Sequence, residues 1–250
     1  MMDATAPPIL AARGVTRTYR TGTHEVTALR GADLDVHAGE LVMVMGPSGN
    51  GKTTLLNCLS GLDDIDDGTV HVDGQDLFAM SDRARTRHRA ERMGFVFQSF
   101  NLIPVLSAEE NVELPLLVTG TAPKAARERA REMLARVGLH GRNTHRPNEL
   151  SGGEQQRVTV ARALVAEPAI VWADEPTGAL DSRTAGGIID LLHEVHAAGQ
   201  TLVVVTHDEA LGRSGERLIQ VRDGRIVQDG TPATAPDRHE VAAPTREGTR

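Results

Sequence analysis

The phosphate loop, defined here as Gly46–Thr53 (GPSGNGKT), combines three glycines with a lysine and a threonine at the spacing G-x-x-x-x-G-K-[ST]. Glycine lets a backbone curl until successive N–H groups point inward at one phosphate. A helix expected over Thr53–Leu62 would add the positive end of its dipole. Lys52 would then reach the β and γ phosphates of a nucleoside triphosphate, and the Thr53 hydroxyl would ligate Mg²⁺.

The residues around the phosphate loop support this interpretation. The apolar run Leu41–Met45 leads directly into the loop, so a strand, a Gly-rich turn and a helix follow in the order that phosphate binding needs. A Gly-rich turn that binds nothing is the alternative, and this order disfavours it. The residues expected to hold the nucleotide here are Gly46, Pro47, Ser48, Gly49, Asn50, Gly51, Lys52, Thr53 and Thr54.

A second apolar run, IVWADE at 170–175, ends in two acids. Acids at the carboxyl end of a parallel strand face the crevice where such sheets bind ligands. Asp174 would hold Mg²⁺ through water, and Glu175 would orient and deprotonate the attacking water. His207 follows the next apolar run, Leu202–Val205, and would hydrogen-bond the γ-phosphate from the same sheet edge. Each of these residues alone is more often structural or solvated, and the phosphate loop upstream favours the catalytic interpretation.

A helix that opens with LSGGEQQ at 150–156 suggests a second anion site. Ser151 and Glu154 match a capping box, which is the plain structural interpretation. Glycines in the first turn, here Gly152 and Gly153, weaken a helix but expose backbone N–H groups at its positive end. Two anion sites in one chain would serve one nucleotide if two chains pair head to tail. Each ATP would then lie between the phosphate loop of one subunit and the Ser151–Gly153 turn of the other.

The elements that position these sites follow from the apolar pattern. The runs Leu41–Met45, Ile170–Ala173 and Leu202–Val205 have the length of buried strands, and helical patterns such as Pro123–Val137 separate them. Strands that alternate with helices predict an α/β domain with a mainly parallel sheet. Residues 81–166 are rich in Arg, Glu and Ala and predict a mostly helical insert, and Arg217–Gln228 predicts a hairpin around an Asp-Gly turn.

Composition argues against several classes of protein. The chain has 250 residues and a net charge of −7, which argues against a nucleic-acid binder. Its single cysteine, Cys58, allows no disulfide within the chain and fits a reducing cytosol. There is no apolar run of about 18 residues, so we expect no membrane-spanning helix, and the N-terminus lacks the pattern of a secretory signal. A role at a membrane would therefore depend on a partner.

The motifs together resemble the nucleotide-binding subunits of ABC transporters. GPSGNGKTT, the glutamine in GFVFQSFNLIP, ELSGGEQQRV, DEPTGALD and the histidine in VVVTHD occur in the order and spacing of that family. The segments 94–116, 150–164 and 173–182 resemble the lipoprotein-release and macrolide-exporter branch, which includes LolD, MacB and FtsE-like proteins. The resemblance implies a P-loop NTPase fold of the ABC type, with a mainly parallel core sheet, an N-terminal antiparallel β subdomain and a mostly helical insert.

The resemblance also implies a domain layout. Residues 9–230 would form the ATPase domain, between a loose tail at 1–8 and a disordered tail at 231–250. Within the domain, residues 9–98 and 167–230 would form the RecA-like core, and residues from about 99 to 166 the helical subdomain.

Further residue roles follow from the resemblance. Tyr19, the only tyrosine, matches the aromatic that stacks on adenine, although a plain strand-edge aromatic is the alternative. Gln98 matches a glutamine that contacts Mg²⁺ and the attacking water. Asp181 belongs to a loop that crosses the dimer interface. The segment Ser99–Leu116 matches the docking surface for a membrane permease, and we expect its apolar residues to be exposed: Phe100, Leu102 and Val105.

The implied function is an ATP- and Mg²⁺-dependent ATPase that works as a homodimer, binds no nucleic acid and powers a separate membrane permease from the cytoplasmic face. Two alternatives remain at this point. One is a mechanotransmission ATPase whose membrane partner regulates a cell-wall enzyme, and the other is a soluble ABC ATPase acting on DNA or the ribosome, which the short acidic chain disfavours.

Three residues depart from the family pattern. Asn50 stands where serine is common and is expected to contribute mainly backbone, Trp172 replaces a small aliphatic residue, and Glu154 replaces a glutamine common in this branch.

Overall fold

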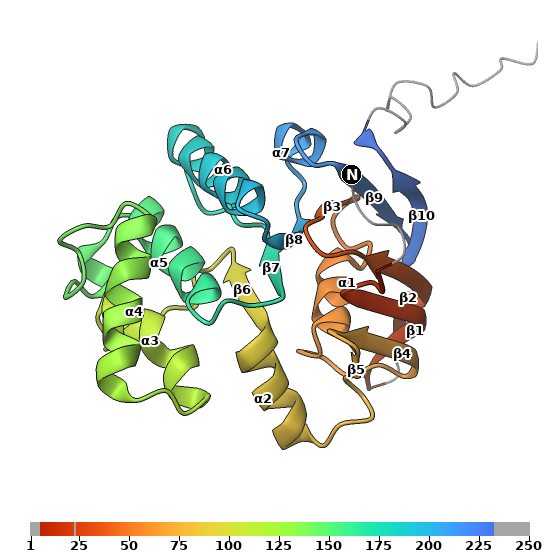
Figure 1. Cartoon of the computed structure of the whole chain (residues 1–250). Coiled ribbons are helices and arrows are strands. Elements are labelled where there is room, and N and C mark those ends of the chain that lie inside the picture. Colours follow the sequence, from red (N-terminus) through yellow and green to blue (C-terminus); the bar gives the residue numbers. More distant parts are fainter. Residues whose placement is uncertain (1–5, 23, 233–250) are drawn as a thin grey trace, which may run out of the picture.

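The computed structural model describes residues 6–22 and 24–232, so both predicted tails lie largely outside the described residues. The elements in chain order are β1 (Leu10–Thr21), β2 (His24–Val36), β3 (Leu41–Met45), α1 (Lys52–Leu59), β4 (Asp67–Val72), β5 (Gln75–Asp76), α2 (Asp82–Arg92), β6 (Met93–Phe97), α3 (Ala108–Val118), α4 (Pro123–Arg136), η1 (Pro147–Glu149), α5 (Gly152–Leu164), β7 (Ile170–Asp174), α6 (Ser182–Ala197), β8 (Thr201–Val205), α7 (Glu209–Arg213), β9 (Arg217–Arg222) and β10 (Arg225–Gly230). Figure 1 shows their arrangement, with α3, α4 and α5 on one side of the central strands and α1 with β1 and β2 on the other.

The central sheet has six strands in the order β10-β9-β3-β8-β7-β6. All neighbouring pairs are parallel except β9 with β10, which form the predicted antiparallel hairpin. The mainly parallel sheet is therefore confirmed. The stretch 81–166 is less uniformly helical than expected, because β6 lies within it and forms the edge of the sheet beside β7.

The two faces of the central sheet bury different partners. Met43 and Met45 of β3 belong to the core that contains residues of α5, α6 and α7. Val42 and Val44, which alternate with them, belong to the core that contains α1 and the antiparallel sheet. Since successive strand residues point to opposite faces, an all-apolar run such as Leu41–Met45 fits only a strand covered on both sides.

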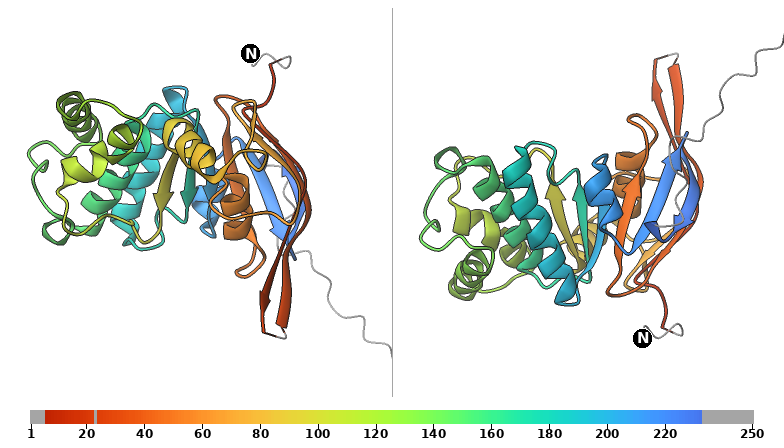
Figure 2. Two further views of the ribbon diagram at one scale, coloured as in Figure 1. Left: turned by 90° about the horizontal axis from the view of Figure 1, so that it is seen from below. Right: turned by 90° about the horizontal axis from the view of Figure 1, so that it is seen from above.

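A four-stranded antiparallel sheet, β2-β1-β4-β5, covers the α1 side of the core. The β1–β2 hairpin is long, and Figure 2 shows it projecting from the side of the molecule. This confirms the expected N-terminal antiparallel subdomain. In addition, Arg30 of β2 donates its backbone N–H to Gly224 O at 2.8 Å, so the hairpin also contacts the β9–β10 turn.

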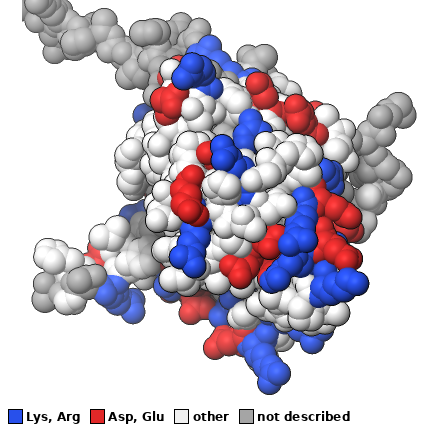
Figure 3. All heavy atoms as spheres, turned by 90° about the vertical axis from the view of Figure 1, so that its left-hand side faces the viewer, with Lys and Arg blue, Asp and Glu red and all other residues white. Residues whose placement is uncertain are grey.

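Helices α3, α4 and α5 pack together, and ion pairs reinforce the contact of α3 with α4. The nearly buried carboxylates Glu109 and Glu113 of α3 accept from Arg131 at 2.6 Å and Arg127 at 2.9 Å. Acidic and basic side chains are interspersed over the face that this part of the molecule presents (Figure 3). Among the helices within residues 6–22 and 24–232, none combines the length and the apolar composition that a membrane crossing requires.

Helix α1 is shorter than the sequence indicates, because it ends at Leu59 rather than Leu62. Gly61, which follows the C-cap Ser60, adopts a positive φ of 65°, which stops helical propagation. The next amides, of Leu62 and Asp63, both donate to Asn57 O at 2.8 and 3.1 Å. The residues after Leu59 therefore form a compact turn at the far end of the helix from the phosphate loop.

Candidate functional site

The phosphate loop joins β3 to α1 and lies against two other chain segments. A Cβ at Gly51, whose φ is 96°, would stand 2.5 Å from Ala28 O, and a Cβ at Gly46 would overlap the carbonyl of Val221. Only glycine fits such close backbone approaches. The loop is therefore held between β2, on one side, and the end of β9, on the other.

The Lys52 side chain is buried within the phosphate loop. Its Nζ donates to Gly46 O at 2.8 Å and to Pro47 O at 3.2 Å. The ammonium group thus lies inside the curl of the loop, where it would meet a bound phosphate. At the start of α1, the Thr53 hydroxyl donates to Asp174 Oδ1 at 3.2 Å.

The sheet order brings the other predicted residues to the same edge. Strand β8 lies between β3 and β7, and all three run parallel, so their carboxyl ends meet. Glu175, directly after β7, has Oε2 at 2.9 Å from His207 Nδ1 and also accepts the His207 backbone N–H at 3.3 Å. Glu175 is largely buried, with a side chain 16% exposed, whereas that of His207 is 67% exposed. The carboxylate, the histidine and the phosphate loop therefore share one edge.

The environment of Asp174 suits a bound cation. Burial raises the pKa of its carboxyl and the neighbouring Glu175 adds to the rise, while the hydrogen bond from Thr53 and the charge of Lys52 oppose it. A raised pKa means that the folded state disfavours the carboxylate, and a nearby cation would relieve that cost. Among the described residues, no cluster of three or more His, Cys, Asp or Glu side chains forms a metal site. The hydroxyl of Thr53 with the Asp174 carboxylate fits Mg²⁺, which typically binds one or two protein oxygens together with substrate phosphates.

A cavity of about 480 Å³ opens over the phosphate loop. This volume lies within the range of small-molecule sites. Its lining residues are Tyr19, Val26, Thr27, Ala28, Arg30, Gly49, Gly51, Lys52, Thr53, Thr54, Asp223 and Gly224. Tyr19 and the phosphate loop therefore border one cavity, as a nucleotide with its base and phosphates would require.

Asn50 makes side-chain contacts in addition to the backbone contribution expected from the sequence. Its Oδ1 accepts the Asp223 N–H at 2.7 Å and its Nδ2 donates to Ser48 O at 3.3 Å. Its backbone carbonyl accepts the Gly224 N–H at 3.2 Å. Asn50 thus links the phosphate loop to the β9–β10 turn. These segments are so far apart in the chain that the sequence gives no indication of the contact.

Gln98 and α5 meet at the loop that follows Glu175. The Gln98 side chain packs against Gly178, where an added Cβ would lie 2.8 Å from Nε2. Gln156 of α5 is buried, and its Nε2 donates to Pro176 O at 2.6 Å and to Phe97 O at 3.4 Å. Sequence reasoning missed Gln156, although a buried polar residue on an apolar helix face is the kind of signal that could have found it.

The Ser151–Gly153 turn caps α5 in the manner the sequence indicates. Ser151 Oγ accepts the Glu154 N–H at 3.3 Å and Glu154 Oε2 accepts the Ser151 N–H at 2.8 Å, which completes the capping box. Asp181, the N-cap of α6, accepts N–H groups from the first turn of that helix. A Cβ at Gly152 would lie 3.4 Å from Leu180, so the turn and the loop that contains Asp181 are neighbours. Of the described residues, those at 151–154 are not among the lining of the phosphate-loop cavity.

The segment Ser99–Leu116 differs in part from the expectation of exposed apolar residues. Val105 is 73% exposed, but Phe100 and Leu102 are half-buried. Leu102 packs against the core that contains the helical subdomain. Arg162 of α5 donates to Phe100 O at 3.0 Å, so this stretch is fixed onto α5 rather than free in solvent.

Comparison with known proteins gives consistent results. The family described as ABC transporter matches residues 29–178 of this chain. An uncharacterized ABC transporter ATP-binding protein of Bacillus subtilis (strain 168), YknY, is 46% identical over 213 residues, which cover 85% of this chain and 93% of YknY. The macrolide export ATP-binding/permease protein MacB of Burkholderia lata is 45% identical over 242 residues, which cover 96% of this chain but 34% of MacB. The chain thus spans about a third of the length of the export ATP-binding/permease relatives that it matches.

A solved structure is similar as well. It is the dimeric structure of a post-hydrolysis state of the ATP-binding cassette MJ0796 bound to ADP and Pi, at 43% identity and a TM-score of 0.82. The alignment covers 89% of this chain and 98% of that one. The P-loop fold with an ABC-type arrangement of sheets and helices is therefore confirmed.

The fold, the phosphate loop and these matches define the class: the chain belongs to the ABC transporter family. Within that family it is an ATP-binding cassette of the MacB-like branch. The roles of individual residues and the boundaries of the subdomains stay predictions, which the geometry above supports.

Proposed function

We propose that two copies of this chain close around two ATP molecules and open after hydrolysis, and that this cycle drives a separate membrane permease. One observation carries the proposal. The phosphate-loop cavity and the Ser151–Gly153 turn are both suited to anions, yet residues 151–154 do not line that cavity in the described part of the chain. The two would serve one nucleotide if a second copy supplied the turn. The similar MJ0796 cassette, whose structure is described as dimeric, supports such a pairing.

The site residues divide the chemistry among them. Lys52 and the amides of the phosphate loop would hold the phosphates, and Glu175 would accept a proton from the attacking water. His207, already within 2.9 Å of Glu175, would contact the γ-phosphate. Mg²⁺ held by Thr53 and Asp174, with Gln98 nearby, would neutralise charge on the β and γ phosphates. Because each ATP contacts both subunits, loss of its γ-phosphate would release the dimer.

We place the permease contact at Ser99–Leu116. The exposed side chains of Ile103 and Val105 lie in this segment. It borders a groove of about 380 Å³ between α2, β6, α3 and α5, which Leu114 and Pro115 help to line. A partner that docks here would hold the chain at the cytoplasmic face of a membrane.

Co-purification from membranes tests the permease. Mass spectrometry should identify an integral membrane protein with the permease fold of macrolide or lipoprotein exporters. Recovery of a cell-wall hydrolase regulator would support mechanotransmission instead. Recovery of ribosomal or DNA-repair proteins without a membrane partner would contradict both.

A substitution at Ser151 tests the shared site. Ser151→Arg should abolish ATP hydrolysis, since the long cation would block the partner's nucleotide, but should leave ATP binding to isolated monomers intact. Ser81→Arg is the matched control, because Ser81 also caps a helix, accepting the Ala84 N–H at the start of α2, and is not part of the proposed shared site. ATPase assays and equilibrium binding at low protein concentration give the two readouts. Equal loss of binding in Ser151→Arg monomers would contradict the shared site.

A further inference from the structure

The Tyr19 side chain is held by two charged residues that no motif singles out. Its hydroxyl donates to Asp63 Oδ2 at 2.6 Å, and the other oxygen of Asp63 accepts from Arg17 Nη2, also at 2.6 Å. The Arg17 guanidinium carbon in turn lies over the Tyr19 ring, 5.0 Å from its centroid. Arg17 and Tyr19 are two positions apart on β1, so both side chains lie on one face of the strand. The three side chains therefore form a closed set of contacts.

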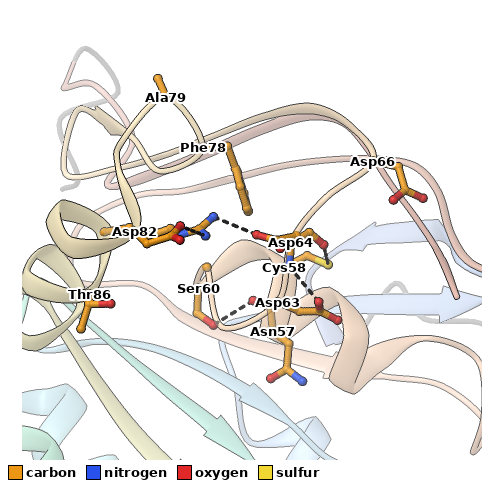
Figure 4. A network of polar contacts seen from close by, with 12 residues as sticks. Asn57, Cys58, Ser60, Asp63, Asp64, Asp66, Phe78, Ala79, Asp82 and Thr86 are labelled. Atoms are coloured by element: carbon orange, nitrogen blue, oxygen red, sulfur yellow. Dashed lines mark hydrogen bonds and ion pairs between the residues drawn. The ribbon is translucent and has the colours of Figure 1, made fainter.

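Asp63 comes from the turn that follows α1, and this turn is fixed to β1 at further points. Asp66 Oδ2 accepts the Thr18 N–H at 2.7 Å, and the Asp66 N–H donates to Thr16 O at 2.9 Å. Figure 4 shows the turn, with the carboxylates of Asp63 and Asp64 directed to different sides. Asp64 pairs with Arg85 at 3.1 Å and takes no part in the Tyr19 contacts.

These contacts determine which ring face is available. Arg17 covers one face of the Tyr19 ring, and the hydrogen bond to Asp63 fixes the ring's edge. Tyr19 also borders the phosphate-loop cavity. A base in that cavity would therefore stack on the ring face that Arg17 leaves open. A ring already held in place loses less conformational freedom when it stacks, which favours binding.

We propose that Arg17 and Asp63 are positioning residues that hold Tyr19 for stacking on the nucleotide base. The inference rests on the proposed role of Tyr19 and extends it to residues without an assigned part. Helix α1 makes the arrangement compact, since the phosphate loop lies at its start and Asp63 follows its end. Helix α1 would then help to position both the residues that contact the phosphates and the tyrosine that contacts the base.

The contacts could instead only fasten α1 to β1, and ligands with and without a base separate the two possibilities. ADP reports phosphate and base contacts together, whereas inorganic pyrophosphate reports phosphate contacts alone. In calorimetric titrations with Mg²⁺, Asp63→Ala should weaken ADP binding by about fivefold, in keeping with a lost charge-assisted hydrogen bond. Pyrophosphate affinity should not change. Asp63→Asn, which keeps the side-chain shape, should give a smaller loss of ADP affinity, and Asp64→Ala is the matched control without effect.

A double substitution shows whether Asp63 acts through Tyr19. In a Tyr19→Ala background, Asp63→Ala should cause no further loss of ADP affinity. Equal weakening of ADP and pyrophosphate, an unchanged ADP affinity in Asp63→Ala, or a full additional loss in the Tyr19→Ala background would each overturn the positioning role. If Tyr19→Ala itself left ADP affinity unchanged, base stacking by Tyr19 would be refuted and this inference with it.

Discussion

Replacement of Glu175 by glutamine isolates the proton-accepting role of this residue from its structural one. Glutamine has nearly the same size, and its Oε1 still accepts hydrogen bonds, but an amide does not accept a proton from water at neutral pH. A positioned general base contributes about 10² to 10⁴-fold to a rate, which corresponds to about 3 to 5 kcal/mol of barrier. We therefore expect kcat for ATP hydrolysis to fall by that factor in Glu175→Gln.

The structural cost of the same change should be much smaller. The substitution turns the carboxylate that faces His207 Nδ1 into a neutral amide, but that imidazole is 67% exposed, and a contact screened by solvent on the histidine side contributes less than about 1 kcal/mol. A loss of that size lowers the melting temperature of a chain this long by about 2 to 4 °C. ATP affinity should persist, because Glu175 does not line the phosphate-loop cavity as the structure describes it. The ATP-bound dimer should then accumulate.

Phosphate release and light scattering provide the measurements. Glu175→Gln with ATP and Mg²⁺ should scatter as a dimer, and the unaltered chain should return to monomer as ATP is consumed. Glu167→Gln is the matched control, since Glu167 precedes β7 and pairs with Arg129 on the surface. Near-normal steady-state hydrolysis in Glu175→Gln would refute its role as the base, and a monomer that still binds ATP would refute dimer closure.

Two further predictions concern contacts around the nucleotide site. Asn50→Ala removes the acceptor for the Asp223 N–H, and loss of one such hydrogen bond, worth about 1 kcal/mol, should weaken ADP binding about fivefold in calorimetry. Unchanged affinity would show that the phosphate loop holds its shape without the β9–β10 turn. The second prediction follows from the Ser151 N–H and hydroxyl, which lower the pKa of Glu154 from its ordinary 4.5. A pKa that is lower in the folded state stabilises the fold above pH 4.5, and this stability is lost as the pH falls through the pKa of the folded state. Glutamine does not titrate, so the melting temperature of Glu154→Gln should fall less from about pH 5 to pH 3 than that of the unaltered chain. An identical fall in both proteins would contradict it.

The sheet and the residues at its edge were predictable because each depends on local sequence. The run Leu41–Met45 is apolar at every position, which predicts burial on both faces, and the polar residues after β7 and β8 then reach a shared edge. Strand β6 was harder to predict, since Met93–Phe97 is short, contains a glycine and follows a strongly charged helix. The end of α1 was misplaced because Gly61 stops the helix through its conformation, and the apolar Leu62 beyond it continues the helical pattern.

The contacts that could not be predicted from the sequence are those between segments far apart in the chain. Asp63 and Tyr19 are 44 positions apart, and Asn50 and Asp223 are 173 apart. Each contact depends on how the antiparallel sheet or the β9–β10 turn packs against α1 and its loop. That packing follows from the whole core rather than from a local pattern, so no local pattern in these segments indicates the pairing.

Gln156 gives a physical link between the hydrolysis site and the helical subdomain. Its buried amide holds α5 to the carbonyls of Pro176, next to Glu175, and Phe97, next to Gln98. A buried hydrogen bond of this kind is costly to break without a replacement partner. A displacement of the loop after Glu175 that keeps the bond therefore moves α5 as well. Because α5 carries Ser151 at its start, the same displacement would shift the turn proposed to close over the partner's nucleotide.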